Sequence, residues 1–471
     1  MKSLTANTPS LGFVGSVKLL LVGEAGDRPW TNVLMIFFPF AVISKYVGWN
    51  PTAQFLLSLA ALIPFAERLG FCTENLAEYT SDTLAGLMNA SMGNAPELII
   101  AIFALKADLI PITQKSLLGS ILSNLMLVMG MSFIVGGYYH FELVHSTALS
   151  QTNALLLILL VAAHGFATIF YQTKASNINV LKLSYVSAIV LLILYLAYLV
   201  FQLKSHSSLF DDEDEELEDS TTALEASTTA GLEDSTQAKF EDTNAKVEYS
   251  TKAKFEDNPK PITPVVVVVS ASGSDAERLP LLKSRNPQHP PEITSAIALI
   301  THQDDDDDKL KLSFRGSIIG LAVVAGLIAL LSEILTDSIS KSAAQMGISE
   351  GFVATILTPI AGNAAEHWSS VTFAAKGRLN VSLGIAIGSS IQIGLFLIPV
   401  ITLSAWAAGK EMSYNFGVFE VSTLAFAVFL AIYASQHGKV QWIMGLILVS
   451  SYVIVITGYL LQNDRTGEIV I

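Results

Sequence analysis

The chain of 471 residues is 51% hydrophobic and only 14% charged, with a mean hydropathy of +0.52 and a formal net charge of −14. Soluble domains carry about 25% charged residues, so this composition is typical of a protein embedded in a lipid bilayer. The acidic balance leaves no basic face to meet phosphates, which excludes nucleic acid as a partner. The single cysteine, Cys72, excludes an intramolecular disulfide and a multi-cysteine metal site.

Long apolar runs predict eleven membrane-spanning helices, because a helix needs about 20 mainly apolar residues to cross a bilayer. Six are expected at 31–49, 53–71, 83–105, 116–138, 151–171 and 180–203, and five more at 316–336, 351–375, 381–404, 416–436 and 440–461. Lys and Arg are shared too evenly between the two sides to orient the chain. With six spans before it, the segment between the two groups lies on the same side as the N-terminus.

That segment holds nearly all of the negative charge. Residues 204–312 contain 24 Asp and Glu against 11 Lys and Arg, a net of −13, whereas the rest of the chain is at −1. Ser, Thr, Asp and Glu dominate 220–310, a composition that predicts a disordered loop. The run at 304–309 is either a further acidic cluster or an engineered protease-site linker.

Two parts of the chain match at a constant offset of 269 residues. Residues 93–97 (GNAPE) align with 362–366 (GNAAE), Gly119 and Ser120 with Gly388 and Ser389, and Ser123 with Gln392. If the first span is set aside, each half has five spans, and an odd number turns the second half upside down. We therefore predict an inverted-topology repeat, an arrangement common in secondary transporters, with the binding site at the membrane midplane.

The predicted organisation has four parts. They are the N-terminal segment with an extra first span (1–50), the first five-helix repeat (51–203), the acidic loop (204–312) and the second five-helix repeat (313–471).

Glu97 and Glu366 fall near the middle of their own spans. A carboxylate at that depth costs at least about 2.5 kcal/mol, so two at equivalent places in a repeat indicate function rather than helix packing. Neutral oxygens and helix-breaking glycines surround them: Asn94, Asn363, Ser120, Ser389, Ser123, Gln392, Gly93 and Gly362. Such a set is typical of a hard cation, and its loose geometry favours calcium over magnesium. For the serines, tight helix packing is an equally good explanation.

The paired glutamates also suggest how two ions are coupled. Two carboxylates in a dry cavity cannot both stay ionised unless a cation neutralises them. A divalent cation and protons would then compete for the same oxygens, which gives antiport without a separate proton path. His367, next to Glu366, either relays protons or packs beside the site.

Further acidic residues lie outside the spans. Glu74 and Glu78 precede the third span and either line the path of a cation or belong to an ordinary interfacial helix. Residues 211–219 hold eight acids in nine positions. They either attract and regulate calcium or form a solvated linker. The first six are Asp211, Asp212, Glu213, Asp214, Glu215 and Glu216.

At these motifs the sequence resembles the calcium/proton exchangers of the calcium–cation antiporter superfamily, most closely their fungal vacuolar members. The matching segments are 87–90 leading into 93–97, 119–125, 359–367 and 384–392. The resemblance implies that Glu97 and Glu366 are the central calcium ligands, and it favours a calcium role for 211–219. It also implies a vacuolar membrane protein with a cytosolic N-terminus and loop, which moves calcium from cytosol to vacuole as protons leave the lumen. The loop departs from the fungal pattern in its length.

The sequence thus predicts an all-α polytopic membrane protein that is a secondary antiporter and not an enzyme, since neither a nucleophile–base pair nor an HExxH motif is found. Calcium is its substrate, protons and the lipid bilayer are its other partners, no cofactor is expected, and a homo-oligomer is compatible with the sequence. Two alternatives are a sodium/calcium exchanger on the same scaffold and a calcium channel. The resemblance favours proton coupling, and two site halves within one chain disfavour a channel.

Overall fold

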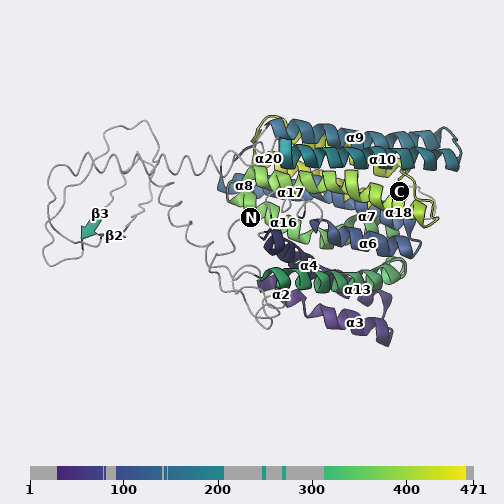
Figure 1. Ribbon diagram of the computed structural model, residues 1–471, viewed down its shortest axis with the longest axis horizontal. Helices are drawn as coiled ribbons and strands as arrows, with labels where there is room; N and C mark the ends of the chain where they lie inside the picture. The colour runs from purple at the N-terminus through teal and green to yellow at the C-terminus, as the bar shows by residue number, and fades with distance from the viewer. Residues whose placement is uncertain are drawn as a thin grey trace. The chain divides into compact units, whose positions relative to one another are not determined.

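The computed structural model describes residues 29–77, 79–80, 88, 92–140, 143–145, 147–205, 247–250, 268–271 and 312–462. Within these ranges the chain is an all-helical, polytopic membrane protein (Figure 1). Eight helical segments are long and apolar enough to span a bilayer: Pro51–Ala77, Ile110–Tyr139, Ser150–Gln172, Asn177–Ser205, Phe314–Met346, Leu379–Ala407, Val418–Ser435 and Trp442–Leu461. Each of them overlaps most or all of a span expected from the sequence.

The helices of the first part are α2 (Pro29–Leu34), α3 (Phe37–Val47), α4 (Pro51–Ala77), α6 (Ala95–Lys106), α7 (Ile110–Leu122), α8 (Met129–Tyr139), α9 (Thr147–Gln172) and α10 (Asn177–Val200). The π-helical turn η1 (Ser123–Val128) joins α7 to α8, and η2 (Phe201–Ser205) follows α10.

The second part contains α13 (Phe314–Met346), α14 (Glu350–Phe352), η3 (Val353–Leu357), α15 (Thr358–Gly362), α16 (Ala364–Ala375), α17 (Leu379–Gln392), η4 (Ile393–Leu397), α18 (Ile398–Ala407), α19 (Val418–Ser435) and α20 (Trp442–Leu461). The turn η4, like η1, lies between two helices of one continuous span. π-Helical turns inside helices are frequent at functional sites.

The other three expected spans differ from a simple long helix. The first is the short pair α2 and α3, whose apolar part is Thr31–Val47. The third is described as α6, while residues 81–87 and 89–91 before it lie outside the described part. The span expected at 351–375 is interrupted at Asn363, which has non-helical ψ of 5° between α15 and α16.

The helix boundaries follow the same 269-residue offset as the sequence repeat. Helices α6 and α16 begin and end at equivalent residues, α7 and α17 begin at equivalent residues, and η1 and η4 end at equivalent residues. The agreement extends to the turn after α6 and α16, where Asp108 and Gly377 both have left-handed backbone (φ +61° and +80°). The repeat is therefore present in the backbone as well as in the sequence.

Buried side chains form two main hydrophobic clusters. One includes Leu125 and Ile391 and lies mostly among α7–α10 and α17–α20; the other includes Leu62 and Ile328 and lies around α3, α4 and α13. Helices α4 and α13 lie side by side (Figure 1). Helix α3 is attached to α13 by Lys45, whose Nζ lies 2.8 Å from Glu333 Oε1 and 3.3 Å from Asp337 Oδ2.

Two short antiparallel pairs complete the described structure. Strand β1 (Leu143–Val144) pairs with β4 (Lys439–Val440) within the helical part. In the central region β2 (Val247–Ser250) pairs with β3 (Val268–Ala271). The acidic run at 211–219 and the rest of the predicted disordered segment lie outside the described residues.

Candidate functional site

Both repeat glutamates lie in the first turn of a short helix. Glu97 belongs to α6 and Glu366 to α16, and Asn94 and Asn363 occupy the N-cap positions. The positive end of a helix dipole favours a carboxylate at this position. Neither asparagine uses its side chain to cap its own helix. Their amides instead reach the opposite half of the repeat.

The two asparagines make reciprocal contacts. Asn94 Nδ2 donates to Gln392 Oε1 (2.8 Å), and Asn94 Oδ1 accepts from Ser389 Oγ (2.9 Å) on α17. Asn363 Nδ2 donates to the backbone carbonyl of Ser120 (3.3 Å) on α7. Asn94 therefore contacts α17, and Asn363 contacts α7, which is the repeat equivalent of α17. Ser120 takes part through its backbone carbonyl.

Glu97 is buried, with 7% of its surface exposed. Its Oε1 has no hydrogen-bond partner and lies against Gly362, where a Cβ atom would overlap the carboxylate oxygen. Asn363 Oδ1 is also buried without a partner. Buried polar atoms are normally hydrogen-bonded, so these two unpaired oxygens are those available to a cation or a proton.

Glu366 is only partly buried, and its Oε2 accepts a hydrogen bond from Asn124 Nδ2 (2.9 Å). Asn124 also donates to Ser389 Oγ (3.0 Å) and accepts from Asn363 Nδ2 (3.2 Å). Asn124 thus connects the two halves, although it was not among the predicted site residues. The signal that could have found it is an asparagine in an apolar span directly after Ser123.

The remaining predicted residues lie at different distances from this cluster. Ser123 Oγ lies 3.0 Å from His367 Nε2, so these two residues form a pair of their own. Gly93 is exposed just before Asn94, and Glu74 is exposed near the end of α4. Glu78 and the run that begins with Asp211 and Asp212 and continues through Glu213, Asp214, Glu215 and Glu216 lie outside the described residues.

The electrostatics of the cluster are those of a cation site. The charge on Glu366 acts on Glu97, and among the described residues neither carboxylate has a Lys or Arg in an ion pair with it. The described residues also contain no group of three or more His, Cys, Asp or Glu that could hold a metal. Any cation bound here would have two carboxylates and neutral amide, hydroxyl and carbonyl oxygens, a donor set that suits calcium.

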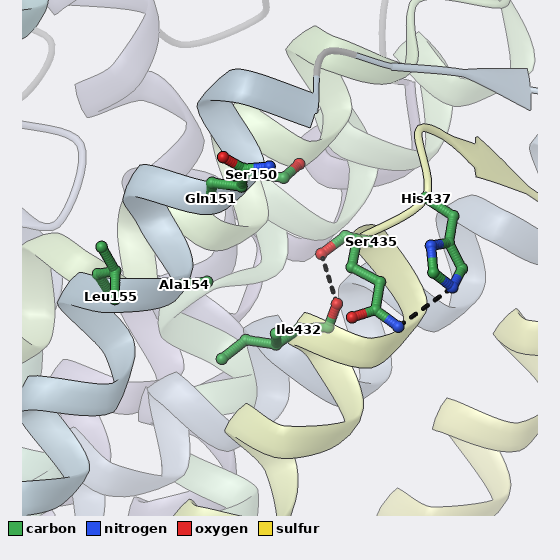
Figure 2. A pocket seen from close by; sticks show the side chains of 8 residues that line it. Ser150, Gln151, Ala154, Leu155, Ile432, Ser435 and His437 are labelled. Carbon is green, nitrogen blue, oxygen red and sulfur yellow. Dashed lines mark hydrogen bonds between the residues drawn. The ribbon is translucent and has the colours of Figure 1, made fainter.

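A surface pocket lies away from this cluster. A pocket of about 450 Å³ lies between the start of α9 and the end of α19, and Figure 2 shows Ser150, Gln151, Ser435 and His437 around it. None of its lining residues belongs to the glutamate cluster. We therefore base the functional assignment on the cluster and not on the pocket.

Comparison with known proteins places the chain in a family. The profile of the sodium/calcium exchanger protein family matches residues 50–204 and 316–461. Vacuolar cation/proton exchanger 2 of Arabidopsis thaliana is 32% identical over 98% of this chain and 86% of its own length. The chain belongs to the cation/proton exchangers of the calcium–cation antiporter superfamily. It is a transporter and not an enzyme, as predicted.

Two further similar proteins extend the comparison. The vacuolar calcium ion transporter of Cryptococcus neoformans var. grubii is 33% identical over 91% of this chain and 73% of its own length. The crystal structure of the Ca2+/H+ antiporter protein YfkE superimposes with a TM-score of 0.65 and 25% identity, covering 92% of this chain and all of the other. The family profile matches residues 50–204 and 316–461 only, whereas these relatives align over more than nine-tenths of the chain.

Proposed function

We propose that this exchanger moves calcium out of the cytosol into the vacuole in exchange for protons. The observation that supports it most directly is the buried Glu97 Oε1, which has no hydrogen-bond partner and lies in a cluster with no basic counter-ion among the described residues. Such a carboxylate needs either a proton or a cation, because an isolated charge in a low-dielectric site is very costly. The names of the vacuolar relatives favour calcium as the cation and the proton as its competitor.

The mechanism follows from competition at one site. Calcium binds when Glu97 and Glu366 are ionised, with Asn94, Asn363, Gly93, Gly362, Ser120, Ser389, Ser123 and Gln392 as further contacts or as residues that shape the site. Protons replace calcium on the same carboxylates, and His367 assists the transfer through Ser123, which lies 3.0 Å away. Binding is therefore mutually exclusive, which couples the two fluxes.

Alternating access needs two related halves. The matched helix boundaries and the reciprocal Asn94 and Asn363 contacts support eleven spans built from an extra first helix and two inverted five-helix repeats. In this arrangement the N-terminus and the acidic loop are cytosolic. For Glu74, Glu78 and the acidic run, the proposed role is to attract or regulate calcium on the cytosolic side.

The decisive experiment is calcium uptake into sealed vesicles with an acidic interior, compared with vesicles that carry an imposed sodium gradient. Uptake should follow the proton gradient and stop when an ionophore collapses it. Uptake that persists without the proton gradient and follows sodium would contradict the proposal and support sodium/calcium exchange. Uptake that needs neither gradient and saturates weakly would instead indicate a channel.

A further inference from the structure

The two short helices that carry the glutamates end in the same backbone turn. After α6, Asp108 N donates to the carbonyl of Leu105 (3.1 Å) and Leu109 N to that of Ala104 (2.9 Å). After α16, Gly377 N donates to the carbonyl of Ala374 (3.1 Å) and Arg378 N to that of Phe373 (2.9 Å). The bonds are equivalent at the 269-residue offset. The side chains that cap the last carbonyls differ between the two turns.

The end of α6 is capped by a permanent cation. Lys410 Nζ donates to the carbonyls of Leu105 (2.7 Å) and Lys106 (3.2 Å) and lies 2.5 Å from Asp108 Oδ1. A positive charge at a helix C-terminus interacts favourably with the helix dipole. Because lysine stays charged throughout the physiological range, this cap is insensitive to pH.

The end of α16 is capped by a histidine. His140 Nε2 donates to the carbonyl of Ala375 (3.0 Å), which is the repeat equivalent of Lys106. Gly377 makes room for the ring, because a Cβ atom there would lie 3.3 Å from two imidazole atoms of His140. Histidine is the side chain type whose charge most often changes near neutral pH, so the two repeats place chemically different caps on equivalent carbonyls.

We propose that His140 is a proton-responsive positioning residue for Glu366. When His140 is protonated, its charge strengthens the hydrogen bond to Ala375 and the interaction with the dipole of α16, so the helix that carries Glu366 is held in place. When His140 is neutral, α16 is held less firmly. The cap of the helix that carries Glu97 is a lysine, so this response of the cap is expected at one glutamate helix and not at the other.

The cap lies at the end of the bundle where α10 and η2 end. His140 follows α8 and precedes β1 and α9, and Tyr198 near the end of α10 donates to Asn153 near the start of α9 (3.1 Å). Charged or titratable side chains of the neighbouring segments, among the described residues, include Lys376, Arg378, Lys439, His437, His145, Tyr138 and Tyr139. His145 lies 3.3 Å from Ser150 Oγ and Arg378 lies over the Phe373 ring, so each has a different neighbour from His140. With the proposed function, His140 senses cytosolic pH.

Two substitutions separate charge from hydrogen bonding. His140→Gln keeps a neutral donor, whereas His140→Lys provides a permanent cation like Lys410. Calcium uptake into sealed vesicles is measured for each variant and the wild type at about pH 5.5 and 7.5 on the loop side, and their KM values are compared as ratios. Relative to the wild type at the same pH, His140→Gln should raise the KM for calcium about two- to fivefold at the lower pH only. His140→Lys should lower the KM for calcium by a similar factor at the higher pH only. Protons compete with calcium equally in the variant and in the wild type at a given pH, so this competition cancels in the ratio of their KM values.

A second measurement does not depend on transport, although the first rests on the proposed function. Hydrogen–deuterium exchange of amides 372–378, corrected for the intrinsic effect of pH, should show equal protection in wild type and His140→Lys at the lower pH. At the higher pH the wild type should be less protected. Protection and KM ratios that do not change with pH would overturn the proposal. A wild type that fails to exchange calcium for protons would overturn the proposed function alone, because the exchange of amides still decides the role of His140.

The reciprocal variant is Lys410→His, which transfers the titratable cap to α6. Protection of amides 103–109 should then become dependent on pH, while that of 372–378 should not change. Gly377→Ala should mimic loss of the cap, because its Cβ crowds His140. Gly347→Ala is the matched control, since Gly347 has the same left-handed backbone (φ +68°) with open space around it.

Discussion

The two repeat glutamates have equivalent positions in the chain and unequal surroundings. Glu97 is buried and its Oε1 lacks a hydrogen-bond partner, whereas Glu366 is partly exposed and accepts from Asn124. The difference continues one turn further along each helix. Ser370, after Glu366, contacts Ser132 Oγ (3.0 Å) and Ser382 Oγ (2.9 Å), while its equivalent after Glu97 is Ala101.

This contrast shows that the repeat supplies two carboxylates but not two identical sites. A carboxylate without hydrogen bonds has more to gain from a proton or a cation than one that is already solvated by an amide. We therefore expect Glu97 to change its bonding most when calcium binds, and Glu366 to be the better oriented of the two.

Removing either carboxylate should have the largest effect. Glu97→Gln and Glu366→Gln keep the shape of the side chain and remove the charge that a divalent cation needs, so calcium exchange should fall by a factor of about 100 or more. Uptake into sealed vesicles under a proton gradient measures this, and normal amounts of protein in the membrane control for folding. Full transport by either variant would place the site elsewhere.

The close approach of Glu97 to the second half depends on a glycine. Gly362→Ala should reduce exchange by about 10- to 100-fold, because its Cβ would overlap Glu97 Oε1 and displace it from the site. Gly388→Ala is the matched control, since nothing lies within 4 Å of the Cβ position there. Calcium binding measured by calorimetry should follow the same order. Equal behaviour of the two variants would contradict the contact.

How far the sequence predicts this site can be judged from individual residues. Glu97, Asn94 and their repeat partners were found because polar residues inside apolar runs are costly and therefore conspicuous, and their repetition at one offset excluded chance. Asn124 was missed because the prediction relied on residues that are repeated in both halves. Its repeat equivalent is Ile393, and a comparison of the two halves finds only what the halves share.

The fold was predicted to a similar extent. Eight of the expected spans are present as long helices because apolar length alone determines them. The interruption at Asn363 lies directly after Gly362, one of the helix-breaking glycines in the sequence, but its contact with the Ser120 carbonyl of the other half could not be predicted. Long-range contacts of this kind leave no local signal in the chain.

Asn124 donates to Glu366 and not to Glu97, and it also bonds Ser389 and Asn363, so its replacement tests the surroundings of the second glutamate. Asn124→Leu removes the donor to Glu366 and makes this half resemble the other, where Ile393 is the equivalent residue. Loss of a hydrogen bond to a charged group costs about 1.5–3 kcal/mol, so KM for calcium should rise about 10- to 100-fold. Ser390→Ala is the matched control, because Ser390 Oγ is buried and bonds only to Ala386 of its own helix. An unchanged KM in Asn124→Leu would show that the contact does not orient Glu366.

The smallest effect is expected at the serines that fasten the second glutamate helix. Ser370→Ala removes the contacts to Ser132 and Ser382 and gives α16 the residue that α6 has in Ala101. Hydrogen bonds between membrane helices contribute about 0.6 kcal/mol each on average, so the free energy of unfolding in detergent should fall by about 1 kcal/mol. Ser338→Ala on α13 is the control, because that hydroxyl bonds only within its own helix. If Ser370→Ala also abolished exchange, these serines would belong to the transport site, and the difference between the two glutamate helices would be functional rather than structural.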